Sequence, residues 1–363
     1  MMLRTTVVAG TLALALLTGV SASAQAADSP NQKSWLTVLA DQKDAQSQPA
    51  TAASEPASEP AEEAAAWPPG LLMEGLDAIG AKKAMDSVGL RAYGFVETGF
   101  TGRLTGGQEP LPGRLLDARR VNNLRLNQFW VTLERPYDKE KAFDIGGRAD
   151  ALYGGDAFWT RALGLDRLGS GNGENWFDPM QFYGQAWLKT GKESGFELQV
   201  GRYIGTVGYE STQAALSPFY SHSYLYDTMG PFTVTGAQAK YYFNSQWSAY
   251  FAVVNGWDDF RDNNDAHSYV TGAAWNSADQ LDGHSRSSAL FNVMTGPEQP
   301  DDVNNYRTVV DGTYTYWWTS KLSETVNADW LMEEQAAPDG SRSRSYGIAH
   351  YLSYLFNERY TGT

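Results

Sequence analysis

Apolar and polar residues alternate with a period of two between residues 123 and 135. Phe129, Val131 and Leu133 share one parity, and the other parity carries polar side chains such as Thr132 and Glu134. Because successive side chains of a strand point to opposite faces, this run predicts a β-strand with one apolar and one polar face. At roughly 10 residues it is long enough to cross a bilayer as a tilted strand.

The pattern restarts at residue 143 after a polar turn. Phe143 and Ile145 lie on one face of this second run, and Asp144, Arg148 and Asp150 lie on the other. Such a hairpin fits a soluble sandwich, which buries its apolar face, or a transmembrane barrel, which turns that face to lipid. The rest of the chain has to distinguish the two.

Similar runs continue along the chain and predict about twelve strands. They lie at residues 90–101, 123–135, 143–154, 180–189, 195–203, 233–243, 246–255, 268–276, 288–295, 306–318, 322–332 and 345–356. The run at 247–254 is apolar on both parities, so its two faces cannot be assigned.

The connections alternate between short and long. The short ones are 136–141, 190–194, 244–245 and 319–321, and the long ones include 102–121, 155–179, 204–232 and 256–267; only 276–286 is longer than its place predicts. Outer-membrane barrels have this asymmetry, with short periplasmic turns and long external loops. We therefore predict an all-β protein, a transmembrane antiparallel up-and-down β-barrel over residues 88–363, instead of a secreted soluble sandwich.

Three segments precede this barrel. Residues 1–26 have Arg4, an apolar stretch and Ala24-Gln25-Ala26, which predicts a signal peptide that is cleaved and takes no part in the fold. Residues 27–69 form an Ala-, Pro- and Glu-rich leader that we expect to be disordered, because it has little apolar surface to bury. Residues 70–87 predict a short amphipathic helix.

Composition supports export more than any intracellular role. Cysteine is absent, so disulfides and thiolate metal sites are excluded, and the net charge of -14 argues against a nucleic-acid partner. The 20 tyrosines and 12 tryptophans gather near predicted strand ends, as in the aromatic girdles of membrane barrels. The chain stops at residues 359–363, at the start of what reads as another strand, so we expect a truncated sequence and more strands in the full-length protein.

Several segments taken together resemble the second putative β-barrel porin family, the OmpL-like outer-membrane porins of bacteria. They are Leu126-Asn127-Gln128 through Pro136, Leu152-Tyr153-Gly154-Gly155-Asp156-Ala157, Val207-Gly208-Tyr209-Glu210, Phe219-Tyr220-Ser221-His222-Ser223-Tyr224, Asn255-Gly256-Trp257-Asp258 and Asn263-Asn264-Asp265. The resemblance covers about residue 71 to the C-terminus and implies an outer-membrane pore of unspecified substrate.

Charged residues on the inward parity are the candidates for lining a pore. They are Arg125, Glu134, Asp144, Arg148, Asp150, Lys240, Arg307, Asp311 and Asp329. Their mixed signs favour a transverse field more than strong ion selection. The alternative is an internal salt-bridge network that fills a narrow barrel.

The long loop from Ile204 to Phe232 follows the fifth strand. The resemblance implies that a loop in this place folds inward and narrows the channel, and the alternative is an external loop over the rim. Glycines permit its turns. Its candidate constriction residues are Tyr209, Glu210, Tyr220, His222, Tyr224 and Asp227.

Other chemistry is poorly supported. Asp258, Asp262 and Asp265 form a weak candidate site for a hard cation, but a solvated loop is the better interpretation. Ser221 and His222 are adjacent on an extended segment and point apart, so a hydrolase is not predicted. No cofactor is expected, and the four histidines lack metal-ligand spacing.

The sequence thus predicts a non-enzymatic outer-membrane porin, in contact with membrane lipid, that passes small hydrophilic solutes or ions. The main alternative is a non-conducting surface or structural barrel with glycan-binding loops. Porins are often trimers, so a homo-oligomer stays open.

Overall fold

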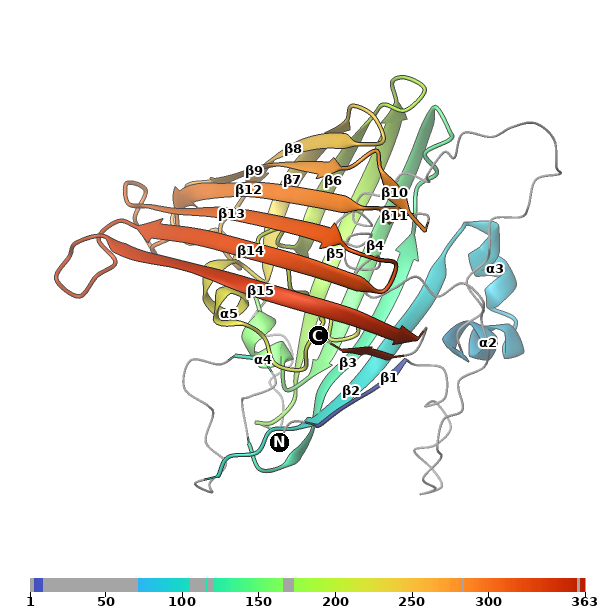
Figure 1. Cartoon of the computed structure of the whole chain (residues 1–363), viewed down its shortest axis with the longest axis horizontal. Helices are drawn as coiled ribbons and strands as arrows, with labels where there is room; N and C mark the ends of the chain where they lie inside the picture. The colour runs from blue at the N-terminus through green and yellow to red at the C-terminus, as the bar shows by residue number, and fades with distance from the viewer. Residues whose placement is uncertain are drawn as a thin grey trace.

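The computed structural model of the chain is built on one antiparallel sheet that curls into a barrel-like wall (Figure 1). The structure describes residues 3–8, 71–104, 115–116, 121–165, 173–282, 284–357 and 360–362. Fourteen strands follow one another in chain order around this wall. They are β1 (Leu3–Val8), β2 (Arg91–Phe100), β3 (Leu124–Arg135), β4 (Phe143–Gly154), β5 (Trp176–Lys189), β6 (Gly195–Ile204), β7 (Thr233–Tyr242), β8 (Trp247–Val254), β9 (Ser268–Asn276), β12 (Ser287–Pro297), β13 (Tyr306–Trp317), β14 (Leu322–Glu333), β15 (Ser343–Asn357) and β16 (Tyr360–Gly362).

The predicted all-β antiparallel fold is confirmed. Strands β2 to β9 and β12 to β15 correspond one to one to the twelve predicted runs. Each pairs with its neighbours in the chain, as in an up-and-down arrangement. The sheet is not closed: within the described residues, no ladder joins β1 to β16.

The two faces of the wall reverse the usual distribution of a soluble protein. Phe129 and Leu133 on β3 are 45% and 42% exposed, whereas Gln128 and Thr132 on the opposite face are each 1% exposed. A soluble sandwich would bury the apolar row between two sheets, so that alternative does not describe this structure. The arrangement matches lipid outside and polar groups inside.

Strand β8 shows why its faces could not be read from the sequence. Trp247 and Phe251 are 49% and 50% exposed on the outer face, and Tyr250 and Val254 are buried on the inner face. The inner face is apolar here because it packs against a loop that enters the barrel. Both parities are therefore apolar for different reasons.

Two features depart from the simplest prediction. Leu3–Val8, inside the expected signal peptide, forms β1 on β2, because the edge of β2 offers unpaired backbone groups to an extended, β-branched segment. Residues 277–286 hold an extra hairpin, β10 (Gln280–Leu281) with β11 (His284–Ser285), which accounts for their length. Cleavage of the signal peptide stays a prediction.

The helices are short, and no helix within the described residues is long and apolar enough to span a membrane. The helix expected over 70–87 consists of α2 (Leu71–Ala78) and α3 (Lys82–Ser87), which separate at Gly80, where φ is +75°. Ala92 N at the start of β2 donates to Met73 Sδ of α2 at 3.4 Å. Helices α4 (Ala157–Thr160) and α5 (Tyr224–Met229) belong to long loops.

Candidate functional site: the barrel interior and its inward loop

The loop between β6 and β7, residues 205–232, lies against the inner face of the wall and is here called the inward loop. Near its start, Asn292 Nδ2 of β12 donates to Thr206 O at 2.9 Å. Near its end, Ser223 caps α5 by accepting from Tyr226 N at 3.3 Å. Buried backbone groups need partners, and the wall supplies several of them here.

One part of the inward loop is bound to β3 and β4. Gln128 Nε2 donates to Thr212 O at 2.9 Å, and Gln128 Oε1 accepts Ala214 N at 3.0 Å. Gln213 Nε2 donates to Asp150 Oδ2 at 3.3 Å. The Gln128 amide thus uses both its donor and its acceptor to hold the loop.

A preceding part of the loop is bound to β14 and β15. Tyr209 N donates to Asn327 Oδ1 at 3.1 Å, and Tyr351 OH donates to Glu210 Oε1 at 2.7 Å. The rings of Tyr209 and Tyr351 also pack at a centroid distance of 4.8 Å. Since β3 and β15 stand near opposite ends of the strand order, the loop links both ends of the open sheet.

Glu210 collects several donors in this region. His222 Nδ1 lies 2.9 Å from Glu210 Oε2, and Ser223 N donates to Glu210 Oε1 at 3.0 Å, in addition to the Tyr351 hydroxyl. Burial opposes ionisation of the Glu210 carboxyl, but the hydrogen bond and charge of His222, with the Ser223 and Tyr351 bonds, lower its pKa overall. The carboxylate is therefore stabilised as an anion.

Apolar packing holds the loop on three sides. Val207 and Met229 join a cluster with inner residues of β5 to β9 and β12 to β14, while Ala214 and Phe232 join a second cluster around Trp130. Tyr209 and Leu216 belong to a third cluster, with Trp317 and Tyr351. The loop is therefore packed against inner residues of many strands.

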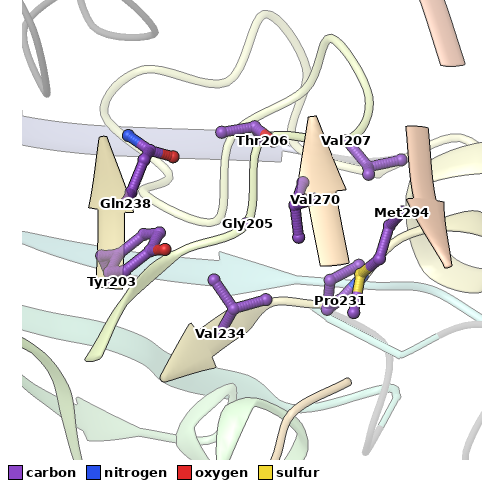
Figure 2. A pocket seen from close by; sticks show the side chains of 9 residues that line it. All are labelled: Tyr203, Gly205, Thr206, Val207, Pro231, Val234, Gln238, Val270 and Met294. Carbon is purple, nitrogen blue, oxygen red and sulfur yellow. The ribbon is translucent and has the colours of Figure 1, made fainter. Parts of the chain in front are cut away.

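Figure 2 shows a small cavity between the ends of the inward loop and the wall. Gly205, Thr206, Val207 and Pro231 line it from the loop, and Tyr203, Val234, Gln238, Val270 and Met294 line it from β6, β7, β9 and β12. Gln238 supplies a polar group to a mainly apolar lining. The cavity carries no cluster of charges that could perform chemistry.

The remaining candidate constriction residues occupy different positions. Tyr220 OH accepts from Asn127 Nδ2 of β3 at 3.1 Å, and His222 stacks on Tyr226 at 4.3 Å between ring centroids. Asp227 is buried in α5, whereas Tyr224 is 57% exposed.

Candidate charges on β3 and β4 lie next to one another. Arg148 Nε is 3.0 Å from Asp150 Oδ1, and Arg148 Nη1 is 3.6 Å from Glu134 Oε2. Asp144 is paired with Arg135 at 3.1 Å. Opposite charges therefore neutralise one another along this part of the wall.

Arg125 has a different partner: its Nη2 donates to Glu174 O at 3.2 Å. Lys240 on β7 places its ammonium 4.9 Å from the Tyr242 ring centroid. Arg307 on β13 pairs with Glu333 on β14 at 3.0 Å.

Asp311 and Asp329 are directly opposite each other on β13 and β14. One amide nitrogen, Asn327 Nδ2, donates to both carboxylates, at 2.7 Å to Asp311 Oδ1 and 2.8 Å to Asp329 Oδ1. Asn292 Nδ2 donates to Asp311 Oδ2 at 2.6 Å. Asn292 and Asn327 also bind Thr206 and Tyr209, so this acidic pair lies next to the start of the inward loop.

The three weak metal candidates do not come together. Asp258 Oδ1 accepts Thr233 N at 2.8 Å, and Asp262 Oδ1 accepts Asn264 N and Asp265 N at 2.8 and 2.9 Å. Within the part of the chain that is described, no three His, Cys, Asp or Glu side chains are grouped to hold a metal ion. These loop carboxylates serve to order turns.

Gln128, Asn327 and Tyr351 were not predicted from the sequence as partners of the loop. The fully buried pair of Arg202 and Asp178, whose Nη1 and Oδ1 atoms are 2.6 Å apart, was not predicted either. The inward parity of Gln128 and Asn327 was readable, but their partners are 84 and 118 residues away.

An antiparallel up-and-down wall with an apolar outer face, a polar inner face and an inward loop defines a β-barrel membrane protein of the porin type. The model of one family, described as Putative beta-barrel porin-2, OmpL-like, matches residues 89–362, so the chain belongs to this family. Membership implies an outer-membrane location and a non-enzymatic channel. No curated protein matches the sequence.

Proposed function

We propose that the protein is a passive outer-membrane porin for small hydrophilic solutes or ions, with the inward loop as its constriction. The single observation that carries the proposal is the inverted wall, in which rows such as Phe129 and Leu133 face outward while Gln128 and Thr132 face inward. Lipid requires the first property, and a hydrated path requires the second. The bonds of the loop to β3, β4, β14 and β15 support a constriction at its level.

Export by a cleaved signal peptide at residues 1–26 belongs to this proposal, as do contact with membrane lipid and assembly into a homo-oligomer. Mass spectrometry of protein extracted from outer membranes would test cleavage at Ala26. A mature chain that begins upstream of residue 27 would contradict it.

Planar-bilayer recording of the purified protein tests conduction. The chain has no cysteine, so a single Ser211→Cys variant places one thiol in the inward loop. We expect stepwise conductance that falls when a bulky thiol reagent reacts with this site. The matched variant Ser341→Cys, in an exposed external connection, should react without a change in current.

This experiment tests conduction and the constriction by the inward loop separately. If the bilayer carries no current although the inserted protein is folded and resists protease, conduction is contradicted. Steps that persist unchanged after complete modification of Ser211→Cys would contradict the constriction alone.

A second candidate function is a non-conducting surface or structural barrel. It is favoured by the near-complete burial of inner polar side chains such as Glu197, Gln199 and Thr325, which are at most 1% exposed, since a wide water-filled lumen would leave them accessible. Saturable glycan binding by the external loops without ion flow would support this alternative.

A further inference from the structure

Two connections at the same end of the wall are tied together: the β8–β9 loop, residues 255–267, and the segment that follows β12, residues 298–305. Trp257 N donates to Glu298 Oε2 at 2.7 Å, and Asn264 Nδ2 donates to Pro297 O at 2.9 Å. Ser268 Oγ donates to Glu298 Oε1 at 2.5 Å. Glu298 is therefore the carboxylate on which this contact centres.

A second buried carboxylate, Asp259, lies beside Glu298. Asp259 is 6% exposed and Glu298 is 8% exposed. Asp259 Oδ2 is buried and finds no hydrogen-bond donor among the described residues. A Cβ built on Gly256 would stand 2.9 Å from Glu298 Oε2 and 3.2 Å from Asp259 Oδ2, so both carboxylates border the same side of Gly256.

Two neighbouring buried carboxylates repel each other when both are ionised. Arg307 is already paired with Glu333 at 3.0 Å, and Asp262 adds further negative charge. A metal ion is disfavoured, because the described residues offer no group of three His, Cys, Asp or Glu side chains. One proton bound by the pair removes the repulsion and the cost of burying a second charge.

We propose that the pair of Asp259 and Glu298 binds one proton, and that this proton locks the β8–β9 loop to the segment after β12, so that the rim loosens as the solution becomes alkaline. The inference goes beyond the proposed function, because it holds whether or not solute passes through the barrel.

The direction of the pH response follows from the two titrations. Burial, and then repulsion by Glu298 and Asp262, raise the pKa of Asp259 to about 7, and burial also raises the pKa of Glu298. The protonated lock is therefore fully present when the pH is below the ordinary pKa of a carboxyl group, and it is lost as the pH rises through about 7.

Hydrogen exchange of the folded full chain in detergent tests the lock. After correction for intrinsic exchange, we expect amides of residues 256–264 to exchange on the order of tenfold faster at pH 8.5 than at pH 5.5. Amides in the β5–β6 hairpin should not change. Asp259→Asn replaces one carboxyl of the pair by an uncharged amide, so its protection should be the same at both pH values.

Two further variants complete the test. Glu298→Gln replaces the other carboxyl and should also abolish the pH response, even if Asp259→Asn does not fold. Asp265→Asn, an exposed residue of the same loop, should behave like the wild type.

The proposal is overturned if wild-type protection does not depend on pH, or if the response persists in both lock variants. It is also overturned if calcium or magnesium restores protection at pH 8.5, because the two carboxylates would then hold a cation.

Discussion

Tyr351→Phe removes one hydroxyl from the contact between the inward loop and β15. That hydroxyl donates to the buried Glu210 carboxylate at 2.7 Å, and the Tyr351 ring packs on Tyr209. Phenylalanine keeps the ring, so the change isolates the hydrogen bond. Glu210 then keeps its His222 and Ser223 donors but loses its direct link to the wall.

The size of the effect follows from the kind of bond. A hydrogen bond to a charged group contributes about 1.5–3 kcal/mol, and each 1.4 kcal/mol is roughly a factor of ten in an equilibrium. We therefore expect the opening equilibrium of the Tyr209–Glu210 segment to rise about 10- to 100-fold. Most of the wall should keep its stability, because the ladders of β14 and β15 are unchanged.

Hydrogen exchange of residues 207–213 is the direct assay, and bilayer recording should show more frequent current fluctuations in parallel. Tyr354→Phe is the matched control, because Tyr354 lies on the outer face of the same strand and is 42% exposed. Equal protection of the loop in Tyr351→Phe and Tyr354→Phe would refute the view that Glu210 fastens the loop to β15.

Three other outcomes follow from the structure. The pKa of Glu210 is lowered on folding, so its contribution is present above its ordinary pKa and is lost as pH falls through the lower folded value; exchange of residues 207–213 should rise in strong acid, and Glu210→Gln should remove that acid response. Phe129→Arg places a charge on the outer face of β3 and should lower the free energy of unfolding by about 2–4 kcal/mol if the site is near the bilayer midplane, as measured by urea titration in vesicles. Thr190→Arg, in the exposed turn after β5, is the control, because Gln128 of β3 itself binds the inward loop and is unsuitable. Arg148→Met leaves the Asp150 and Glu134 carboxylates without their guanidinium and should destabilise the barrel by about 3–5 kcal/mol, and a stability equal to wild type in the same titration would contradict the pairing.

The strands were predictable because their signal is local. A period of two is visible in any run with one lipid face and one polar face, so the twelve runs coincide with β2 to β9 and β12 to β15. The signal fails at β8, where the inner residues Tyr250 and Val254 meet the apolar inward loop. It fails also at 277–286, because a two-residue hairpin is too short to show a period.

The contacts of the loop were less predictable. The sequence marked Glu210 and His222 as polar groups in a glycine-containing loop, and the structure brings them within 2.9 Å. It could not identify Tyr351 as the partner of Glu210, because 141 residues separate them and only the curvature of the whole sheet brings them together. A long-range partner of this kind follows from the path of the sheet, not from local spacing.

The attachment of one loop to both β3 and β15 has a consequence for biogenesis. The residues that Gln128 holds come from the middle of the chain, and Tyr351 is synthesised only near its end. The bonds on the two sides of the loop can therefore exist together only after β15 has joined the wall.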